Sequence, residues 1–384
     1  MKKKVLYFSW EILSFDTEDV FEQMEIKYKK IFGSVEEVLL KGNTLKKIQD
    51  ELINNEYDYV FTYDYFPNIS ELCHKYGVKY IIWIYDCPSN VLYSKNVVNK
   101  CNYFFLFDMS MSEILADRGV KNIFEMPLSV NTRRLNNLLG KNILGAKYKY
   151  DVSFLGSLYE DNSFDKICYL PKYISGYING IISAQRKLWG INLVGELLSK
   201  NIVDELDKYI KFSNNSEIEI PSKDMYCEFI NGKISSIDRI EIINRLSERF
   251  EMNLFTASDR TICPKCYYRG YVNYKNQMPF VFRDSKININ ITIRSIKRGI
   301  PLRCIDIMGA GGFLLSNYQS DLCKYFEPGV DFVLFDDEDD IVNKVDYYLK
   351  NDYERKNIAL SGWKKIQKLF RSDERFKEIF ARVD

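Results

Sequence analysis

The sequence predicts an α/β protein built from two doubly wound parallel sheets. Its 384 residues exceed what one ordinary hydrophobic core accommodates, so two domains are expected. Short apolar runs alternate with helical patterns along most of the chain. This alternation is typical of parallel sheets that carry helices on both faces. The composition, 46% hydrophobic and 28% charged, is that of a globular protein.

The first part of the chain has four apolar runs separated by helical patterns. Strands are expected at Lys4–Ser9, Tyr57–Tyr63, Tyr80–Tyr85 and Tyr103–Phe107. Helices are expected between and after them, in residues 19–32, 44–55, 69–77 and 111–119. This succession predicts the first parallel sheet.

Three consecutive strands of this sheet are each followed by an aspartate, at Asp64, Asp86 and Asp108. The carboxyl ends of parallel strands form the ligand crevice of such a sheet, so three carboxylates are expected near one rim. Alternatively, each aspartate caps the helix that follows, and for Asp108 this explanation is at least as good. Asp86 differs because Cys87-Pro88 follows it, and proline directs the chain into a turn.

A second set of elements begins after residues 127–142. An expected strand at Val152–Leu155 runs into Gly156-Ser157, a link whose backbone amides can meet a phosphate, although the same composition is common without a ligand. Residues 165–250 then show an almost unbroken helical pattern, which predicts a helical insertion. Strands are expected to resume in residues 252–258, 268–274, 286–292, 311–317 and 331–337.

Residues 299–317 combine a short helix, glycines and an apolar strand. The helix is expected from about Arg303 to Met308, followed by a glycine-rich turn and a buried strand at 313–315. Arg303 and Asp306 are three residues apart and therefore share one helix face. Glycines in the turn allow the backbone to approach another group closely.

The charge balance and the apolar runs exclude several classes of protein. Lysine and arginine (54) nearly cancel aspartate and glutamate (53), which argues against nucleic acid as an obligate partner. No stretch approaches the roughly 20 apolar residues that cross a bilayer. The amino-terminal residues lack the cleavage pattern of a signal peptide, so a cytoplasmic protein is expected.

No metal site is expected. The nine cysteines are scattered, as is usual for reduced thiols. Cys263 and Cys266 are the one pair at metal-ligand spacing, but a structural zinc needs four ligands. We favour an ordinary loop pair over a metal or redox role. The acidic run at Asp336–Asp340 is interpreted as the first turn of a helix, where acids complement the helix dipole.

Several segments resemble a known family. Residues 150–159, 270–317 and 325–349 are similar to the carboxyl-terminal domain of GT-B fold glycosyltransferases of the CgeB-like, spore-maturation type. Residues 81–90, 103–110 and 126–135 are similar to the partner domain of that family. The resemblance covers most of the chain, is densest in residues 270–350 and is weakest in the helical region.

The resemblance implies a GT-B architecture, with two Rossmann-like domains facing a central cleft. Residues 1–145 would form the acceptor-side domain, and residues 146–350 the nucleotide-sugar-binding domain, with its helical region at about 165–250. Residues 351–384 have apolar positions at roughly helical spacing. They would form helices that cross back to the first domain, or helices that pack only on their own domain.

The resemblance also implies a glycosyltransferase that moves a sugar from a nucleotide-sugar donor, with a UDP-sugar as one candidate, to a protein or glycan acceptor. No cofactor and no metal ion would be needed. Asp306 would accept hydrogen bonds from the ribose hydroxyls, where related enzymes usually have glutamate. Arg303 would pair with the diphosphate. The remaining donor contacts would come from Gly156, Ser157, Tyr271, Val272, Arg294, Gly311 and Gly312, with Arg298 as either a further cation or a surface residue.

An inverting transferase also needs a general base for the acceptor hydroxyl. The candidates in the first domain are Asp86, Asp16 and Asp64. Asp86 is favoured because the D-x-P turn recurs in the family that the sequence resembles. A retaining enzyme would need no such base. A nucleotide-sugar epimerase or hydrolase of the same fold and a non-catalytic donor-binding scaffold stay open as alternatives.

Overall fold

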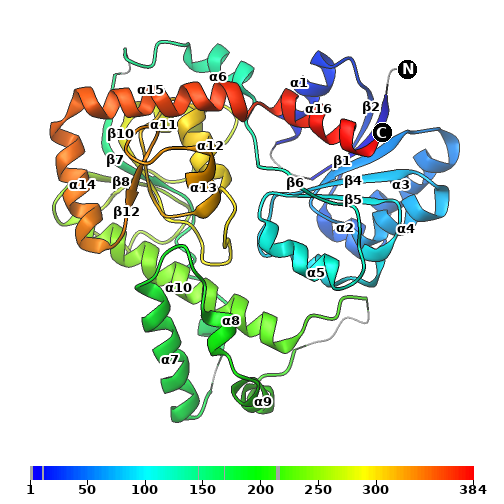
Figure 1. The fold of residues 1–384 in the computed structure, drawn as a ribbon, viewed down its shortest axis with the longest axis horizontal. Helices are drawn as coiled ribbons and strands as arrows, with labels where there is room; N and C mark the ends of the chain where they lie inside the picture. The colour runs from blue at the N-terminus through cyan, green and yellow to red at the C-terminus, as the bar shows by residue number, and fades with distance from the viewer. Residues whose placement is uncertain (1–2, 11–12, 146, 168, 213–216) are drawn as a thin grey trace. The chain divides into compact units, whose positions relative to one another are not determined.

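The computed structural model describes residues 3–10, 13–145, 147–167, 169–212 and 217–384. These residues form two compact units. Unit 1 contains the described residues of Met1–Asn131, Asn214–Ile220 and Phe370–Asp384, and unit 2 contains those of Thr132–Ser213 and Pro221–Leu369. Figure 1 shows the consequence for unit 1, where the red last helix packs with the blue and cyan first part of the chain.

Unit 1 is built on a six-stranded sheet in the order β2-β1-β3-β4-β5-β6, in which every neighbouring pair is parallel. Its strands are β1 (Lys4–Ser9), β2 (Lys27–Phe32), β3 (Tyr59–Tyr63), β4 (Lys79–Ile84), β5 (Asn102–Leu106) and β6 (Ile123–Glu125). The direction of winding reverses between β1 and β3. In this kind of sheet, the crevice beyond the carboxyl ends of those two strands is the usual ligand position.

The helices of unit 1 include one from the far end of the chain. They are α1 (Ser14–Gln23), α2 (Val35–Leu39), α3 (Asn43–Asn54), α4 (Pro67–Tyr76), α5 (Ser112–Ala116) and α16 (Ser372–Val383), with short 3₁₀ turns η1 (Asn90–Tyr93), η2 (Lys95–Val98) and η3 (Met109–Met111). Phe376 of α16 lies with its ring centroid 5.1 Å from that of Phe21 and 5.2 Å from that of Phe61. The last helix therefore completes the core of unit 1.

The four strands expected in this unit are confirmed, each within two residues of its expected bounds. The expected helix at 19–32 is wrong in its second half, because α1 ends at Gln23 and Lys27–Phe32 forms β2. β2 is the edge strand, and only Ile31 among its side chains is buried. Its lysines therefore stay in solvent, so the strand lacks the apolar run that marks a central parallel strand.

Unit 2 is built on a second parallel sheet in the order β12-β11-β10-β7-β8-β9. Its strands are β7 (Tyr150–Leu155), β8 (Met252–Phe255), β9 (Tyr267–Tyr268), β10 (Ser285–Asn290), β11 (Leu314–Asn317) and β12 (Val333–Phe335). Read from β9, this is the Rossmann order of strands 3-2-1-4-5-6. The winding reverses between β7 and β10, which places the expected ligand crevice beyond Leu155 and Asn290.

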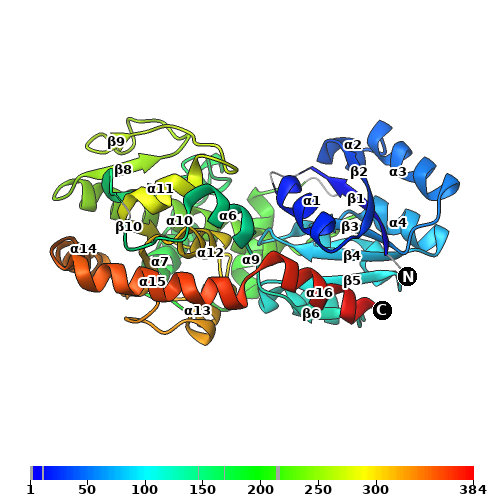
Figure 2. The same cartoon turned by 90° about the horizontal axis from the view of Figure 1, so that it is seen from above.

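Helices surround this sheet, as Figure 2 shows from above. They are α6 (Thr132–Leu139), α7 (Lys172–Arg186), α8 (Val194–Leu197), α9 (Lys200–Tyr209), α10 (Ser222–Ser247), α11 (Met278–Asp284), α12 (Leu302–Gly309), α13 (Ser320–Tyr325), α14 (Glu338–Lys350) and α15 (Asp352–Leu369), with one 3₁₀ turn, η4 (Phe164–Lys166). The expected short helix in the glycine-rich segment is confirmed as α12. Asp337 caps α14 by accepting hydrogen bonds from the amides of Asp339 and Asp340, so the acidic run has the expected helix-start geometry.

The helical region expected at 165–250 is confirmed as η4 and α7–α10, and its first part has a core of its own. Ile178 and Ile182 of α7 pack in one apolar cluster with Tyr226 and Ile230 of α10. The last turns of α10 belong instead to the core of the sheet, through Ile243 and its neighbours. Since α10 takes part in both cores, it fixes the helical insertion to the Rossmann-like body of unit 2 (Figure 1).

Candidate functional site

The carboxyl end of β7 opens into a tightly fixed turn. Gly156 has φ +156°, a conformation that favours glycine. The hydroxyl of Ser157 accepts a hydrogen bond from the amide of Tyr159 at 3.0 Å, and the amide of Leu158 donates to the Ser258 hydroxyl at 3.3 Å. Ser258 follows β8. The turn after β7 is therefore held against the segment that follows β8 at the same edge of the sheet.

A buried arginine from α10 connects this turn to the strand on its other side. Nη1 of Arg239 donates to the main-chain oxygen of Ser157 at 2.6 Å. Its Nε and Nη2 donate to the main-chain oxygen of Ile291 at 3.1 and 2.7 Å. The guanidinium also lies 4.5 Å from the ring centroid of Tyr159. Arg239 thus links the segments that follow β7 and β10, which flank the winding reversal of the sheet.

The charge of Arg239 is buried. Arg239 is 9% exposed, and no carboxylate in the described parts of the chain lies within ion-pair distance of it. Burial lowers the pKa of its guanidinium, and the positive charge of Arg303 lowers it further. A buried and uncompensated charge costs several kcal/mol, about the range given for ions removed from water. An anion bound at this edge would offset that cost.

The sequence pattern did not single out Arg239. It lies three and four residues before Ile242 and Ile243, both of which are buried. That spacing puts it on the buried face of α10, and this is the signal that identifies it. A charged residue in a helix is otherwise assigned to solvent.

The two polar residues expected on α12 both contact the segment that precedes β10. Nη1 of Arg303 lies 2.8 Å from Sδ of Met278, and its guanidinium lies 5.4 Å from the ring centroid of Phe282. The hydroxyl of Tyr274 donates to Oδ1 of Asp306 at 2.9 Å. One face of α12 therefore presents a cation and a carboxylate that are both held by residues 274–282.

Tyr271 and Val272 follow β9 and so lie at the carboxyl edge of the sheet, the edge where Gly156 lies. Tyr271 is 74% exposed, whereas Tyr274, three residues later, is buried against Asp306. The expected strand at 268–274 is wrong beyond Tyr268, because β9 comprises only Tyr267–Tyr268. The loop after β9 thus leads from the edge of the sheet to α12.

Gly311 and Gly312 lie elsewhere. They precede β11 and are therefore at the amino edge of the sheet, opposite Gly156. A Cβ atom on Gly312 would lie 2.7 Å from the main-chain oxygen of Phe282, and Gly311 has φ +80°. Packing and backbone conformation within the protein account for both glycines, so we leave them out of the site.

Arg294 is buried, and its side chain is occupied by contacts within the protein. It forms an ion pair with Asp238 at 2.7 Å in which both side chains are 5% exposed, and its guanidinium lies 3.4 Å from the ring centroid of Trp189. These contacts tie the end of the β10 segment to the helical insertion. Arg298 has a mostly exposed side chain and lies 3.7 Å from a carboxylate oxygen of Asp321.

A cavity of about 450 Å³ lies beside the beginning of α14 in unit 2. Its charged walls are largely paired with one another: Arg186 lies 3.0 Å from Asp238, and Arg245 lies 3.6 Å from Glu338. The remaining lining residues are Ser183, Lys187, Trp189, Glu241, Ile242, Asp336, Asp337 and Asp339. A site for one more charge is not evident there.

The structure brings together two of the aspartates that follow the strands of unit 1. Asp64 is buried and has φ +56°, and its Oδ1 accepts the amides of Tyr85 at 2.9 Å and Asp86 at 3.0 Å. Asp86 is exposed and precedes the cis Cys87-Pro88 bond. Although solvent reaches Asp86, the surrounding protein desolvates its carboxyl and raises its pKa. Asp64 thus fixes the backbone from which Asp86 projects.

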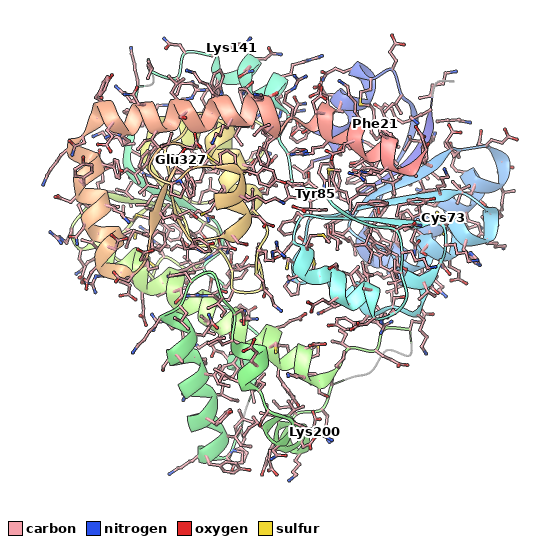
Figure 3. The ribbon with its side chains drawn as sticks, viewed as in Figure 1. Phe21, Cys73, Tyr85, Lys141, Lys200 and Glu327 are labelled. Carbon is pink, nitrogen blue, oxygen red and sulfur yellow. The ribbon has the colours of Figure 1, made fainter. Side chains whose placement is uncertain are left out.

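Asp16 lies in the first turn of α1, next to the same edge of the sheet, and is 7% exposed. The hydroxyl of its neighbour Thr17 lies 2.8 Å from that of Tyr63, whose ring centroid is 4.6 Å from that of Tyr85. Asp108 accepts a hydrogen bond from the amide of Ser110 and caps the next 3₁₀ turn, which is the alternative that its sequence context allowed. Figure 3 shows Tyr85 near the ends of the strands of unit 1.

Among the residues that the structure describes, no group of three or more potential metal ligands is present. Cys263 and Cys266 form one turn between β8 and β9, in which the amide of Cys266 donates to the oxygen of Cys263 at 3.1 Å. Within the same residues, no helix is both long and apolar enough to span a membrane.

Comparison with known proteins bears on both units. Residues 239–381 match the family model described as glycosyl transferase-like. The match covers less than half of the chain and includes Arg239, α12 and most of α16. No curated protein matches the sequence. The chain has the GT-B fold, and its residues 239–381 are similar to glycosyl transferases.

Solved structures share this fold over the full length of the chain. HepE from Anabaena, in complex with UDP and glucose, has a TM-score of 0.52 at 10% identity over 99% of both chains. T4 phage BGT, in complex with its UDP-glucose substrate, has a TM-score of 0.52 at 12% identity over 100% of both chains. The lipopolysaccharide outer core galactosyltransferase WaaB has a TM-score of 0.51 at 11% identity, again over 100% of both chains. At these identities the likeness is one of fold.

Proposed function

We propose that this chain is a glycosyltransferase that takes its sugar from a nucleoside diphosphate sugar bound at the carboxyl edge of the sheet of unit 2. The observation that carries the proposal is the buried Arg239 at the winding reversal between β7 and β10, whose charge has no carboxylate partner among the described residues. A diphosphate supplies the missing negative charge. A UDP-sugar is the first donor to test, because HepE and T4 phage BGT were solved with UDP ligands.

The donor would lie along the edge of the sheet with each part near a suitable group. Arg239 and Arg303 would face the diphosphate, next to the backbone of Gly156 and Ser157. Arginine suits this role because its planar guanidinium can donate two parallel hydrogen bonds to phosphate oxygens. Asp306 would accept from the ribose.

Tyr271 and Val272 would face the base, since they follow the strand next to β8 at the same edge. The exposure of Tyr271 leaves its ring available to a ligand. Aromatic rings stack on bases without strong preference among them. The loop after β9 therefore suits the base, while the choice of sugar depends on residues outside it.

Departure of the nucleoside diphosphate builds up negative charge on the leaving oxygen. Fixed cations and amides that already point at that charge lower the barrier without reorganisation. Arg239 and Arg303 would provide this stabilisation, and the reaction would proceed without a bound metal ion. EDTA is therefore expected to leave transfer unchanged. Loss of transfer in EDTA that a divalent ion restores would contradict this part of the proposal.

The acceptor would be a glycan or a protein hydroxyl, and the general base would come from unit 1. Asp86 is the best candidate of the three aspartates because it is exposed and has a raised pKa. A base whose pKa lies closer to neutrality is a better proton acceptor. Asp64 would position Asp86 through the two amides that it binds. Asp16 would be the third candidate, at the first turn of α1.

We further propose a cytoplasmic enzyme of the CgeB-like type, in line with the motifs of residues 150–159 and 270–349. The purified protein should be incubated with UDP-, GDP- and ADP-sugars, with and without glycan and peptide acceptors. Transfer to an acceptor would support the proposal. Isomerised or hydrolysed donor would favour an epimerase or hydrolase, and binding without turnover would favour a scaffold.

A further inference from the structure

Cys263 and Cys266 lie at the two ends of one tight turn in unit 2. The turn is Cys263-Pro264-Lys265-Cys266, in the loop between β8 and β9, and the amide of Cys266 donates to the main-chain oxygen of Cys263 at 3.1 Å. A β-turn closed by such a bond keeps its two outer Cα atoms within about 7 Å. Disulfides usually join Cα atoms about 4.4–6.8 Å apart. The backbone therefore places the two cysteines where a disulfide can form without a large movement.

Contacts before and within the turn hold it in place. The side-chain amide of Asn244 in α10 donates to the main-chain oxygen of Ile262 at 3.1 Å, one residue before the turn. Cys263 belongs to the apolar core of the sheet. Pro264 stands at the second position of the turn, where the fixed φ of proline is already the value that the turn requires. Because the turn is ordered beforehand, closing a disulfide across it costs little chain entropy.

The two thiols differ in exposure and in acidity. Cys266 is partly exposed, whereas Cys263 is 1% exposed. Hydrogen bonding with the Cys263 thiol lowers the pKa of Cys266, although burial opposes this shift. The same hydrogen bond, together with burial, raises the pKa of Cys263. Cys101 and Cys227 are also partly exposed, but burial raises the pKa of each to about 11. Cys266 therefore has a larger thiolate fraction at neutral pH than these two.

A partly exposed thiol of lowered pKa next to a second, buried thiol is typical of redox-active cysteine pairs. We propose that Cys263 and Cys266 form a reversible dithiol–disulfide pair that reacts with low-molecular-weight disulfides, with Cys266 as the attacking thiol and Cys263 as the resolving thiol. The inference does not depend on the proposed function. It takes up the redox alternative that the sequence left open for this pair.

The reaction is a thiol–disulfide exchange in two steps. The Cys266 thiolate attacks one sulfur of a disulfide RSSR, the S–S bond breaks, and RS⁻ leaves with the bonding electrons. Cys266 is then a mixed disulfide without the negative charge that kept Cys263 protonated. Cys263 gives its proton to solvent, and its thiolate attacks the Cys266 sulfur and releases the second RS⁻. Each RS⁻ takes up a proton, so the pair loses two electrons and two protons and RSSR becomes two RSH.

Peptide mass spectrometry of the full-length protein tests the pair. The protein is equilibrated with mixtures of reduced and oxidised glutathione, and its remaining thiols are then blocked with N-ethylmaleimide. Trypsin cleaves after Arg260, Lys265 and Arg269, so it yields peptides 261–265 and 266–269 with one cysteine each. In oxidised glutathione we expect these peptides joined, two hydrogens lighter than the sum of the free peptides. Dithiothreitol should restore two separate, alkylated peptides.

Single substitutions separate the roles of the two thiols. Cys263→Ala should stop at the mixed disulfide, with glutathione on Cys266, because the resolving thiol is gone. Cys266→Ala should carry no glutathione on Cys263, because that thiol is buried. Cys227→Ala removes another partly exposed thiol and is the matched control, in which the disulfide should form as in the wild type. The wild-type result decides the inference even if Cys263→Ala does not fold.

Alkylation of the reduced wild type measures the reactivity of the attacking thiol. At neutral pH, Cys266 should react with iodoacetamide at least about tenfold faster than Cys227, because a lower pKa leaves a larger thiolate fraction. Separate peptides in oxidised glutathione would overturn the inference. A wild type that accumulates glutathione on Cys266 without closing the disulfide would also overturn it. Reaction of Cys266 no faster than that of Cys227 would overturn its assignment as the attacking thiol.

Discussion

Nη1 of Arg239 donates to the main-chain oxygen of Ser157 at 2.6 Å. This bond joins α10, the last helix of the insertion, to the turn that follows β7. The same guanidinium holds the main-chain oxygen of Ile291 beyond β10. One side chain therefore fixes both segments at the winding reversal of the sheet and brings a positive charge to the place where a diphosphate would bind.

Arg239→Gln is expected to weaken UDP binding and to leave uridine binding almost unchanged. A charge-assisted hydrogen bond is worth about 1.5–3 kcal/mol, which corresponds to roughly a 10- to 150-fold loss of UDP affinity. Uridine lacks phosphates and would therefore not contact the guanidinium in the proposed site. Titration calorimetry with both ligands measures the difference.

Arg245→Gln is the control for the loss of an arginine from the same helix, because Arg245 is 43% exposed and pairs with Glu338. It should bind UDP as the wild type does. Since Arg239 also fixes two segments, its variant should melt at a lower temperature. Equal weakening of UDP and uridine in Arg239→Gln would show that the residue acts on structure alone.

Arg303→Ala and Asp306→Ala are each expected to weaken UDP binding by about 1.5–3 kcal/mol. Arg303→Ala should weaken the binding of UDP but not that of uridine. Asp306→Ala should weaken the binding of both ligands, because both contain ribose. Circular dichroism should show that both variants are folded. Wild-type UDP affinity in both variants would remove α12 from the donor site.

Asp86→Asn is expected to reduce kcat by about 10²- to 10⁴-fold, the range for loss of a general base, with UDP affinity unchanged. The base is active when deprotonated, so activity is present above its pKa and is lost as the pH falls through it. Because the pKa of Asp86 is raised, the acid limb of the wild-type profile should lie above about 3.9, the ordinary aspartate value.

Asp108→Asn is the control, since Asp108 caps the turn after the next strand and asparagine caps equally well. Its kcat and pH profile should match those of the wild type. Full activity of Asp86→Asn would exclude Asp86 as the base and would favour a retaining enzyme or another aspartate.

Phe376→Ala is expected to destabilise unit 1 by about 3–5 kcal/mol, as large-to-small changes at buried aromatic positions do. The ring lies among those of Phe21, Phe61 and Trp83. Thermal unfolding followed with and without UDP should show a lower first transition and nearly unchanged UDP affinity at 15 °C. Tyr353→Ala, at an exposed position, should leave both unchanged. A wild-type melting curve for Phe376→Ala would show that α16 adds little to unit 1.

The strands of both sheets could largely be predicted from the sequence because each buried parallel strand is an apolar run. β2 was missed because an edge strand can keep its lysines in solvent. The turn at Gly156 and the shared face of Arg303 and Asp306 are local features, so short sequence patterns were enough to identify them.

The remaining parts of the site depend on contacts between distant segments. Arg294 is occupied by Asp238, which is 56 residues away and belongs to the insertion. Arg239 and Ser157 are 82 residues apart. No local pattern predicts that Arg294 has a carboxylate partner whereas Arg239 has none within the described ranges. This difference separates a structural arginine from a candidate ligand-binding one.

The most direct test of the account is a crystal structure of the full-length protein with UDP. We predict that the diphosphate lies between the Gly156-Ser157 turn and Arg303, within hydrogen-bond distance of Arg239, and that the ribose lies on Asp306. Nucleotide in the cavity lined by Arg186 and Arg245, or at the sheet of unit 1 with the edge at Gly156 empty, would contradict the account.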